Sequence, residues 1–257
     1  MSRRIVVTSG KGGVGKTTVC VMLGMALAAL NKKVVILDLD FSLNNLDVVA
    51  AVENKVVYDI GDVVSGRCRV KQAMIEVERN LYVIQSGHSF SDNVNGQNVR
   101  LLIDGLKNYD FVLLDCPAGI GKEFARAVAS ANEAIVLVNP TLSSLRDADK
   151  VVNILLTYKL DDIFAVVNKV RGDLIIKDKL LSVEDVEDII KLPVIGAIPD
   201  DDEVLISSGG ELKTAGAMRA VRLLAKRLVK GDGKLYDCLK EYKGIAGRIK
   251  MALKKRA

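Results

Sequence analysis

The chain has few cysteines and no long hydrophobic run, and both absences limit what it can be. Its 257 residues contain four widely spaced cysteines and no Cys-x-x-Cys pair. This spacing indicates neither a zinc site nor a redox pair, and reduced thiols of a cytoplasmic protein are the expectation. The longest apolar run, Val19–Leu30, has twelve residues including Gly24, too few to span a membrane. The N-terminus leads directly into an apolar segment that reads as a strand, so we expect no signal peptide.

The charge of the chain is concentrated near its C-terminus. The net charge is +5, but the segment from Arg222 to Ala257 carries 12 Lys and Arg against 3 Asp and Glu, a balance of +9. The preceding 221 residues carry 25 against 29, a balance of −4. A DNA-binding protein is expected to have a basic body, so this distribution argues against nucleic acid as a partner.

A glycine-rich motif follows the first apolar segment. It satisfies G-x-x-x-x-G-K-[ST] with Gly10, Gly15, Lys16 and Thr17, and it contains a further lysine, Lys11, that the pattern does not require. An apolar strand precedes the motif and a helical pattern follows it, so backbone N–H groups and a helix N-terminus would converge on phosphate. We therefore expect a nucleoside triphosphate to be bound by Gly10, Lys11, Gly12, Gly13, Val14, Gly15, Lys16, Thr17 and Thr18.

Short apolar strands alternate with helical patterns along the chain, which predicts an α/β fold with a doubly wound, mostly parallel sheet flanked by helices. We expect a single domain over residues 1–230, followed by a linker and an amphipathic helix over 231–257. The expected strands are Ile5–Thr8, Val34–Asp38, Leu81–Gln85, Phe111–Asp115, Ala134–Asn139, Ile163–Val167 and Val194–Ile198. The expected helices include Asn98–Lys107, Lys122–Ser130, Ser144–Leu156 and Ser182–Ile190.

Carboxylates stand at the ends of two of these strands, where ligands bind in such sheets. Asp115 ends an apolar strand in the manner of a Walker B aspartate, and Asp38 and Asp40 end another. With Thr17 as direct ligand, Asp115 is expected to hold a water of the Mg²⁺ shell. Of Asp38 and Asp40, one could support Mg²⁺ and the other could orient the attacking water. Each carboxylate could instead be a solvated or structural turn residue.

The residues described so far resemble the deviant Walker A family of ParA/MinD ATPases. The resemblance is carried by KGGVGKTT at Lys11–Thr18, DLDFSLNNLD at Asp38–Asp47, DCPAGI from Asp115 and NPTLSSLRDADK at Asn139–Lys150. It extends over nearly the whole chain and is closest to the members of the family that determine the septum site. One departure is Cys116, which stands where a serine often follows the Walker B aspartate.

The resemblance implies roles that the residues alone do not give. Lys11 is the signature lysine, which in this family reaches the phosphates bound by the other subunit of an ATP-dependent homodimer. Lys11, Lys16 and Asp40 are then the catalytic residues of a Mg²⁺-dependent ATPase that is slow without a stimulating partner. In this assignment Asp40 orients the attacking water, and Asp38 and Asp115 support Mg²⁺ through its waters. The resemblance also implies that Asn168 and Pro199 lie next to adenine. Ser143, Ser144 and Asp147 are implied to belong to the dimer and partner surface.

The C-terminal tail has the pattern of a basic amphipathic helix. After Gly231–Gly233, apolar residues recur at helical spacing from Leu235 to Leu253, with basic residues around them. Such a helix can lie on an anionic membrane, with each basic residue contributing about 1 kcal/mol. The part Leu235–Tyr242 could dock on the body, whereas the predicted membrane segment begins at Lys243. Its expected contacts are Lys243, Ile245, Arg248, Ile249, Lys250, Leu253, Lys254 and Lys255.

One such tail should bind reversibly, and two tails on a dimer should gain avidity of roughly 10²–10⁴. The expected protein is therefore a membrane-switch ATPase on the inner face of the cell membrane. It would recruit a division inhibitor and respond to an ATPase-stimulating or polar-anchoring partner. The alternatives are a flagellar-number regulator, a ParA-type DNA-partition ATPase, an iron–sulfur carrier and a nucleotide-holding scaffold without turnover.

Overall fold

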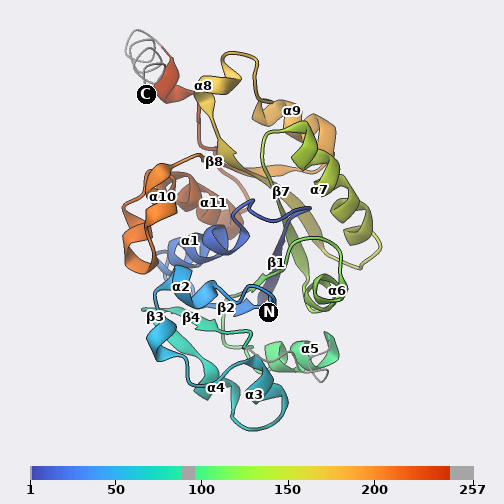
Figure 1. Ribbon diagram of the computed structural model, residues 1–257, viewed down its shortest axis with the longest axis vertical. Coiled ribbons are helices and arrows are strands. Elements are labelled where there is room, and N and C mark those ends of the chain that lie inside the picture. The colour runs from blue at the N-terminus through green and yellow to red at the C-terminus, as the bar shows by residue number, and fades with distance from the viewer. Residues whose placement is uncertain (1, 88–95, 244–257) are drawn as a thin grey trace.

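The apolar strands assemble into one eight-stranded sheet in the computed structural model, which describes residues 2–87 and 96–243 (Figure 1). The strand order is β3-β4-β2-β5-β1-β6-β7-β8, and all neighbours are parallel except β3 and β4. The predicted doubly wound fold and its seven strands are confirmed. The strands are β1 (Arg3–Thr8), β2 (Val34–Asp38), β3 (Ile75–Glu78), β4 (Leu81–Ile84), β5 (Phe111–Asp115), β6 (Glu133–Val138), β7 (Asp162–Val170) and β8 (Val194–Pro199).

Helices cover both faces of the sheet. The longer helices are α1 (Lys16–Ala28), α5 (Gly96–Asp104), α6 (Lys122–Ala129), α7 (Leu142–Leu155), α9 (Val183–Ile190) and α11 (Met218–Lys230). Shorter helices are α2 (Leu46–Ala50), α3 (Ile60–Val64), α4 (Val70–Ala73), α8 (Gly172–Ile175) and α10 (Asp202–Ile206), with 3₁₀ turns at Glu53–Lys55, Gly209–Lys213 and Lys240–Tyr242.

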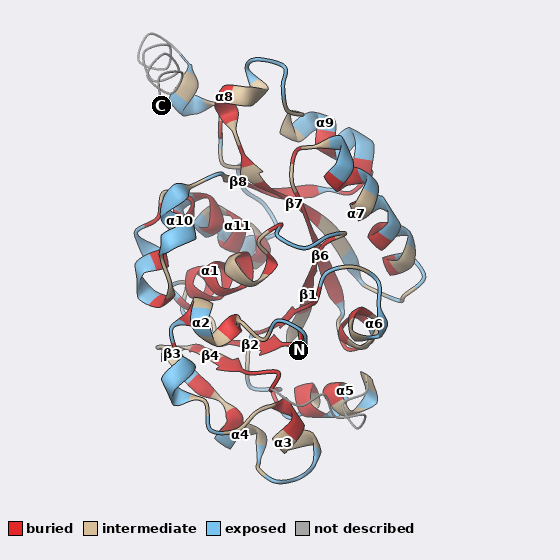
Figure 2. Cartoon of the chain, in the orientation of Figure 1, coloured by how far each residue is buried: buried red, intermediate tan, exposed pale blue. Residues whose placement is uncertain are grey.

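Alternation along each strand divides the core into two layers. In β1, Ile5 and Val7 pack into the layer formed with α1 and α11, whereas Val6 packs into the layer formed with α5, α6, α7 and α9. Successive side chains of a strand point to opposite faces, so a strand covered on both sides must be apolar throughout. Figure 2 shows the result as buried strands between helices whose outer faces are exposed.

Local signals fix where helices begin and end. Helix α9 begins with a capping box in which Ser182 Oγ accepts from the N–H of Asp185 (3.0 Å) and the Asp185 carboxylate accepts from the N–H of Ser182 (2.9 Å). Helix α11 ends at Gly231, whose left-handed φ of 80° suits glycine and whose N–H donates to the carbonyl of Arg227 (2.8 Å). The predicted break at Gly231 is thus the cap of a helix that sequence reasoning did not identify.

The segment after this cap docks on the body, as predicted, but it is not the predicted helix. Residues Leu235–Leu239 contain no helix, and within the described chain, which ends at residue 243, they are followed by the 3₁₀ turn Lys240–Tyr242. Tyr236 packs against both core layers, Cys238 is buried, and Gly172 of α8 leaves no room for a side chain beside the carbonyl of Cys238 and the ring of Tyr242. We call Leu235–Tyr242 the tail root.

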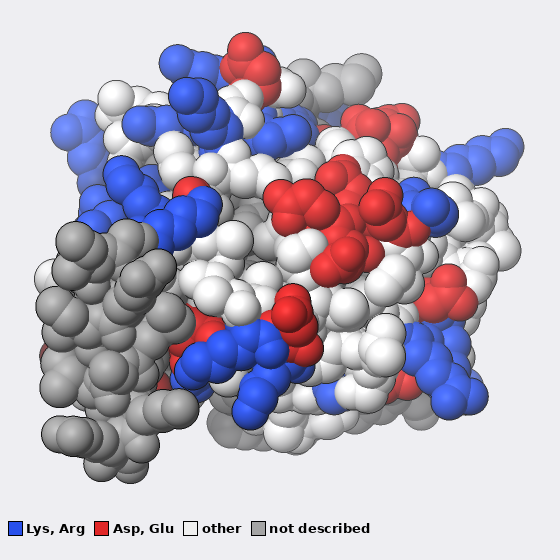
Figure 3. Space-filling model, turned by 90° about the horizontal axis from the view of Figure 1, so that it is seen from above, with Lys and Arg blue, Asp and Glu red and all other residues white. Residues whose placement is uncertain are grey.

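Charge is distributed unevenly over the end of the molecule where α9 lies. Figure 3 shows acidic side chains gathered near the centre of this face, with basic side chains around them. Helix α9 contributes four exposed carboxylates, those of Glu184, Asp185, Glu187 and Asp188. Across residues 2–87 and 96–243, no helix is both long and apolar enough to cross a bilayer.

The buried ring of Phe124 provides a test of this packing. It lies on α6 against the sheet and is 1% exposed, so Phe124→Ala should lower the free energy of unfolding by about 3–5 kcal/mol. Urea unfolding followed by circular dichroism measures the change. The control Leu101→Ala removes a side chain of α5 that is 62% exposed and should change stability by at most about 0.5 kcal/mol. Equal effects of the two substitutions would contradict the assigned core.

Candidate functional site

The glycine-rich motif forms a loop between β1 and α1 at the carboxyl edge of the sheet. Gly13 and Gly15 have left-handed φ values of 74° and 98°, which glycine adopts without strain. Gly10 permits the loop to touch α7, because a Cβ there would lie 2.3 Å from the backbone carbon of Asp147. Lys16 is buried at the start of α1, whereas Lys11 is exposed.

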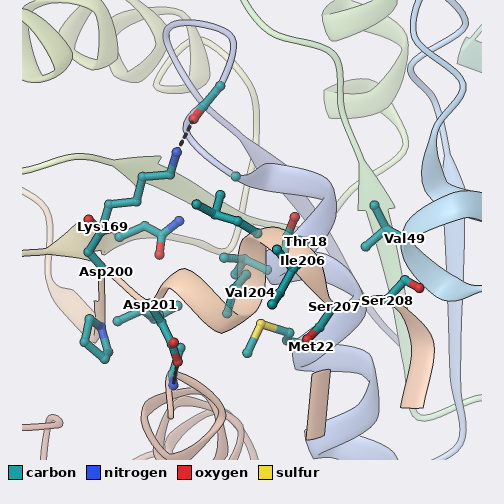
Figure 4. Close-up of a pocket in the computed structure, with 18 of the residues that line it drawn as sticks. Thr18, Met22, Val49, Lys169, Asp200, Asp201, Val204, Ile206, Ser207 and Ser208 are labelled. Carbon is teal, nitrogen blue, oxygen red and sulfur yellow. Dashed lines mark hydrogen bonds between the residues drawn. The ribbon is translucent and has the colours of Figure 1, made fainter. Parts of the chain in front are cut away.

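Two consecutive residues of β7 hold the outer side of this loop. Asn168 Nδ2 donates to the carbonyl of Val14 (2.8 Å), and Lys169 Nζ donates to the carbonyl of Gly13 (2.9 Å). Figure 4 shows the Lys169 side chain reaching the loop. The structure therefore places Asn168 against the phosphate loop as well as beside the cleft described below. Lys169 was not among the predicted site residues.

Two buried carboxylates lie side by side behind the loop. Asp38 of β2 and Asp115 of β5 are direct partners in the parallel register and are 0% and 1% exposed. Burial is the main cause that raises the pKa of Asp38 to about 8, and the Asp115 carboxylate adds to it. Burial also raises the pKa of Asp115 to about 7, against the lowering effect of the Thr17 hydroxyl and the Lys16 amine.

These carboxylates have unused hydrogen-bonding capacity. Asp38 Oδ1 accepts from the N–H of Asp40 (2.9 Å), but Asp38 Oδ2 and both oxygens of Asp115 accept no hydrogen bond. The hydroxyl of Thr17 donates to Asn45 Oδ1 at 3.4 Å, the long end of hydrogen bonding. Buried acceptors without donors are costly, so the set suits a hydrated cation such as Mg²⁺, whose waters supply donors.

Asp40 begins the loop that connects β2 to α2. Its Oδ1 accepts from the N–H groups of Ser42 (3.2 Å) and Leu43 (3.1 Å), which fixes the turn. Asn44, in a left-handed conformation with φ 44°, accepts from Ser86 Oγ (2.7 Å) and from the side-chain amide of Gln85. Sequence reasoning missed this Asn44–Gln85–Ser86 network. The position of Gln85 and Ser86 after β4, at the same sheet edge, was the available signal.

Beside the loop lies an open cleft of about 540 Å³ (Figure 4). Its walls combine the loop glycines with apolar side chains of α1, α2 and α10. The predicted adenine neighbours, Asn168 and Pro199, both line it, and so does Thr18. Lining residues that were not predicted include Met22, Val49, Lys169, Asp200, Val204 and Ile206.

The residues assigned to a partner surface occupy different environments. Ser143 is exposed, and Asp147 pairs with Lys150 across one turn of α7 (3.4 Å). Ser144 is buried, and its Oγ accepts from the N–H of Asn139 (3.0 Å). The assignment of Ser144 to a surface was therefore wrong, because its hydroxyl holds the turn between β6 and α7.

The predicted membrane residues lie almost entirely outside the described part of the chain. Lys243 is exposed and its Nζ lies 3.3 Å from the Asp237 carboxylate. The other seven, Ile245, Arg248, Ile249, Lys250, Leu253, Lys254 and Lys255, are not among residues 2–87 and 96–243.

Comparison with known proteins identifies the family. The model of the CobQ/CobB/MinD/ParA nucleotide-binding domain matches residues 5–226. The septum site-determining protein MinD of Synechocystis sp. is 38% identical over 263 residues, covering 98% of this chain and 99% of that protein. A putative MinD of Emiliania huxleyi is 44% identical over 212 residues, covering 81% of this chain and 78% of that protein.

Solved structures agree with the sequence relatives. The MinC:MinD cell division complex of Aquifex aeolicus matches with a TM-score of 0.83 and 36% identity, over 92% of this chain and 98% of that chain. MinD of Pyrococcus horikoshii, complexed with Mg-ADP, matches with a TM-score of 0.78 and 28% identity, over 90% and 97%. A ParA family ATPase from Chlorobium tepidum, 20% identical with a TM-score of 0.75, shares the fold.

This chain therefore belongs to the CobQ/CobB/MinD/ParA family of nucleotide-binding domains. Within that family these curated relatives are MinD proteins, so the predicted resemblance to the septum-site-determining ATPases is confirmed. The predicted class, a nucleotide-binding ATPase, is confirmed with it.

The buried carboxylate pair makes nucleotide-free stability dependent on pH. Both folded pKa values lie above the ordinary value of 3.8, so the folded state holds protons that the unfolded state releases between about pH 4 and 7. Stability should fall as pH rises through this window, by up to about 1.4 kcal/mol per pH unit for each group. Asp38→Asn should reduce that slope, measured by urea unfolding without Mg²⁺ or nucleotide. Parallel profiles for the parent and the variant would contradict the assignment.

Proposed function

We propose that this chain is a Mg²⁺-dependent ATPase that positions the division septum, dimerising with ATP and attaching to an anionic membrane. The proposal rests on the groups that lie together at the carboxyl edge of the sheet. A phosphate loop, a buried lysine and two buried carboxylates lie together, and three of the four carboxylate oxygens lack a hydrogen-bond donor, while a second lysine of the loop is exposed. The relatives reported above are MinD proteins, and the solved structure of one of them is a complex with Mg-ADP.

The phosphate loop and Lys16 would bind the ATP phosphates, and Thr17 with Asp38 and Asp115 would hold Mg²⁺, the aspartates through water. The bound cation supplies positive charge that neutralises the phosphates. Asp40 Oδ1 accepts hydrogen bonds from the N–H groups of Ser42 and Leu43. The other oxygen of Asp40 would orient the attacking water. The cleft beside Asn168 and Pro199 has room for the adenosine.

Lys11 is assigned to a second copy of the chain. It is exposed and forms no ion pair among the described residues, so its amine is available to a partner. Positive charge brought in from a second subunit stabilises charge that grows during phosphoryl transfer, in the manner of an arginine finger. Hydrolysis would then depend on dimer formation, and the monomer would be slow.

Attachment to the membrane is assigned to the segment that begins at Lys243. The proposed domain boundary lies after residue 230, between the ATPase domain and the linker and tail over 231–257. The tail root docks beside α8, so the basic segment starts from a fixed point on the body. Two segments on one dimer would bind together, which links nucleotide state to peripheral attachment. An ATP-bound dimer on the membrane would recruit a division inhibitor, as the MinC:MinD complex suggests, and hydrolysis would release the dimer. A further partner would either stimulate the ATPase or anchor the dimer at the cell pole.

The two lysines of the loop should separate binding from hydrolysis. Lys16→Ala removes the buried amine and should raise the Kd for ADP about tenfold or more. Lys11→Ala should leave ADP binding near that of the parent but lower the ATP hydrolysis rate by about 10³-fold. Fluorescent-nucleotide titration and phosphate release measure the two quantities. Lys55→Ala, at an exposed lysine of a 3₁₀ turn, is the control. Hydrolysis by Lys11→Ala at the parent rate would rule out its catalytic role.

Deletion of residues 243–257 should abolish membrane binding and leave nucleotide binding intact, because the cut preserves the tail root. Co-sedimentation with anionic vesicles, in ATP and in ADP, measures the attachment, and neutral vesicles serve as control. The parent should bind anionic vesicles in ATP and bind less in ADP. ATP-dependent binding that persists after the deletion would place the membrane contact elsewhere in the chain.

A further inference from the structure

The hydrogen-bond register between β7 and β8 changes at the phosphate loop. Val167 pairs with Ala197, but the next pair joins Val170 to Pro199, so β7 advances three residues while β8 advances two. One extra residue is therefore inserted in β7, as in a β-bulge. The core layers locate the extra residue between Val167 and Val170. Both valines pack into the same layer although two residues separate them, whereas in a regular strand one residue separates side chains on the same face.

The inserted residue is Lys169, which has a left-handed φ of 55°. In a regular strand, Asn168 and Lys169 would point to opposite faces of the sheet. The bulge instead lets both side chains reach the phosphate loop, which lies on the α1 side. Non-glycine residues in this conformation carry a cost of order 1 kcal/mol, so the bulge is an unfavourable feature that is retained beside the site.

The two side chains act on adjacent peptide groups of the loop. Lys169 Nζ donates to the carbonyl of Gly13 (2.9 Å) and Asn168 Nδ2 to that of Val14 (2.8 Å). A trans peptide directs its C=O and N–H to opposite sides. Holding these carbonyls toward β7 therefore turns the N–H groups of Val14 and Gly15 away from it. Among the described residues, no backbone carbonyl accepts from either N–H.

The close packing of Asn168 against Gly15 supports this orientation of the loop peptides. A Cβ on Gly15 would lie 2.7 Å from Asn168 Nδ2, so Asn168 occupies the space that a larger residue would need. We call the side chains of Asn168 and Lys169, which hold the loop carbonyls, the clamp. The amine of Lys169 lies at the wall of the nucleotide cleft (Figure 4). Its hydrogen bond is charge-assisted, which makes it stronger than the amide bond beside it.

We propose that Lys169 is a positioning residue of the nucleotide site: with Asn168, it holds two loop carbonyls outward so that the N–H groups of Val14 and Gly15 face the phosphates. The inference rests on the nucleotide site proposed above. It assigns to Lys169 an action through the loop rather than a contact with phosphate. The bulge in β7 is then the feature that brings a second donor to the loop.

The test compares loop order and nucleotide affinity in variants of the full-length chain. Lys169→Met keeps the length of the side chain but removes the donor, and should raise the Kd for ADP by about tenfold to a hundredfold. It should also speed amide hydrogen exchange in residues 10–17 of the nucleotide-free chain. Lys169→Arg restores a donor and should stay within about threefold of the parent in both measurements.

Two further variants keep the test decisive. Glycine adopts the left-handed conformation of position 169 without strain, so Lys169→Gly should fold at least as stably as the parent. Because it lacks the amine, it should bind ADP as weakly as Lys169→Met. Lys191→Met removes an exposed lysine of the same conformation, φ 56°, at the end of α9, and should match the parent in affinity and exchange.

Each outcome distinguishes the explanations. Parent-like ADP affinity of Lys169→Met would overturn the proposal, and weaker affinity with unchanged loop exchange would overturn it in favour of direct contact between Lys169 and ADP. Failure of the parent chain to bind ADP would instead contradict the proposed function. Loop exchange in the nucleotide-free variants would still report whether the clamp orders the loop.

Discussion

Close packing around the phosphate loop is the constraint on which the site depends. The loop touches the backbone of α7 at Gly10 and the side-chain amide of Asn168 at Gly15, and neither contact leaves space for a Cβ. Three elements that are distant in sequence, α1, α7 and β7, are therefore positioned relative to one another through a few backbone atoms. The same contacts place the cleft and the carboxylate pair around the loop.

The site is energetically incomplete without a ligand. Asp38 and Asp115 lie side by side inside the protein with oxygens that lack donors, and the raised pKa values express the cost of ionising them there. A hydrated cation and a nucleotide would supply the missing donors and positive charge. The free energy of ligand binding would then arise where buried polar groups of the folded chain lack partners, which suits the proposed nucleotide-dependent switch.

Much of this arrangement was predictable because it is local in sequence. The glycine motif and the aspartates that end β2 and β5 are short patterns, and the parallel fold then brings strand ends together. The clamp was not predictable, because Lys169 enters the site only through the register of β7 against β8. The edge strand β3 was missed because four alternating residues, Ile75–Glu78, are a weak signal. Helix α11 was missed although Met218, Val221, Leu224 and Leu228 recur at helical spacing.

Docking of the tail root on the body also buries one of the four cysteine thiols. Cys238 belongs to this segment and is buried against the body, and burial raises the pKa of its thiol to about 12. A thiol reacts as its thiolate, so Cys238 is protected from alkylation for as long as the root stays in place. Cys20 and Cys116 are fully buried within the core, whereas Cys68 is partly exposed. The four cysteines thus differ in burial. The alkylation rate of Cys238 would report whether the tail root is docked on the body.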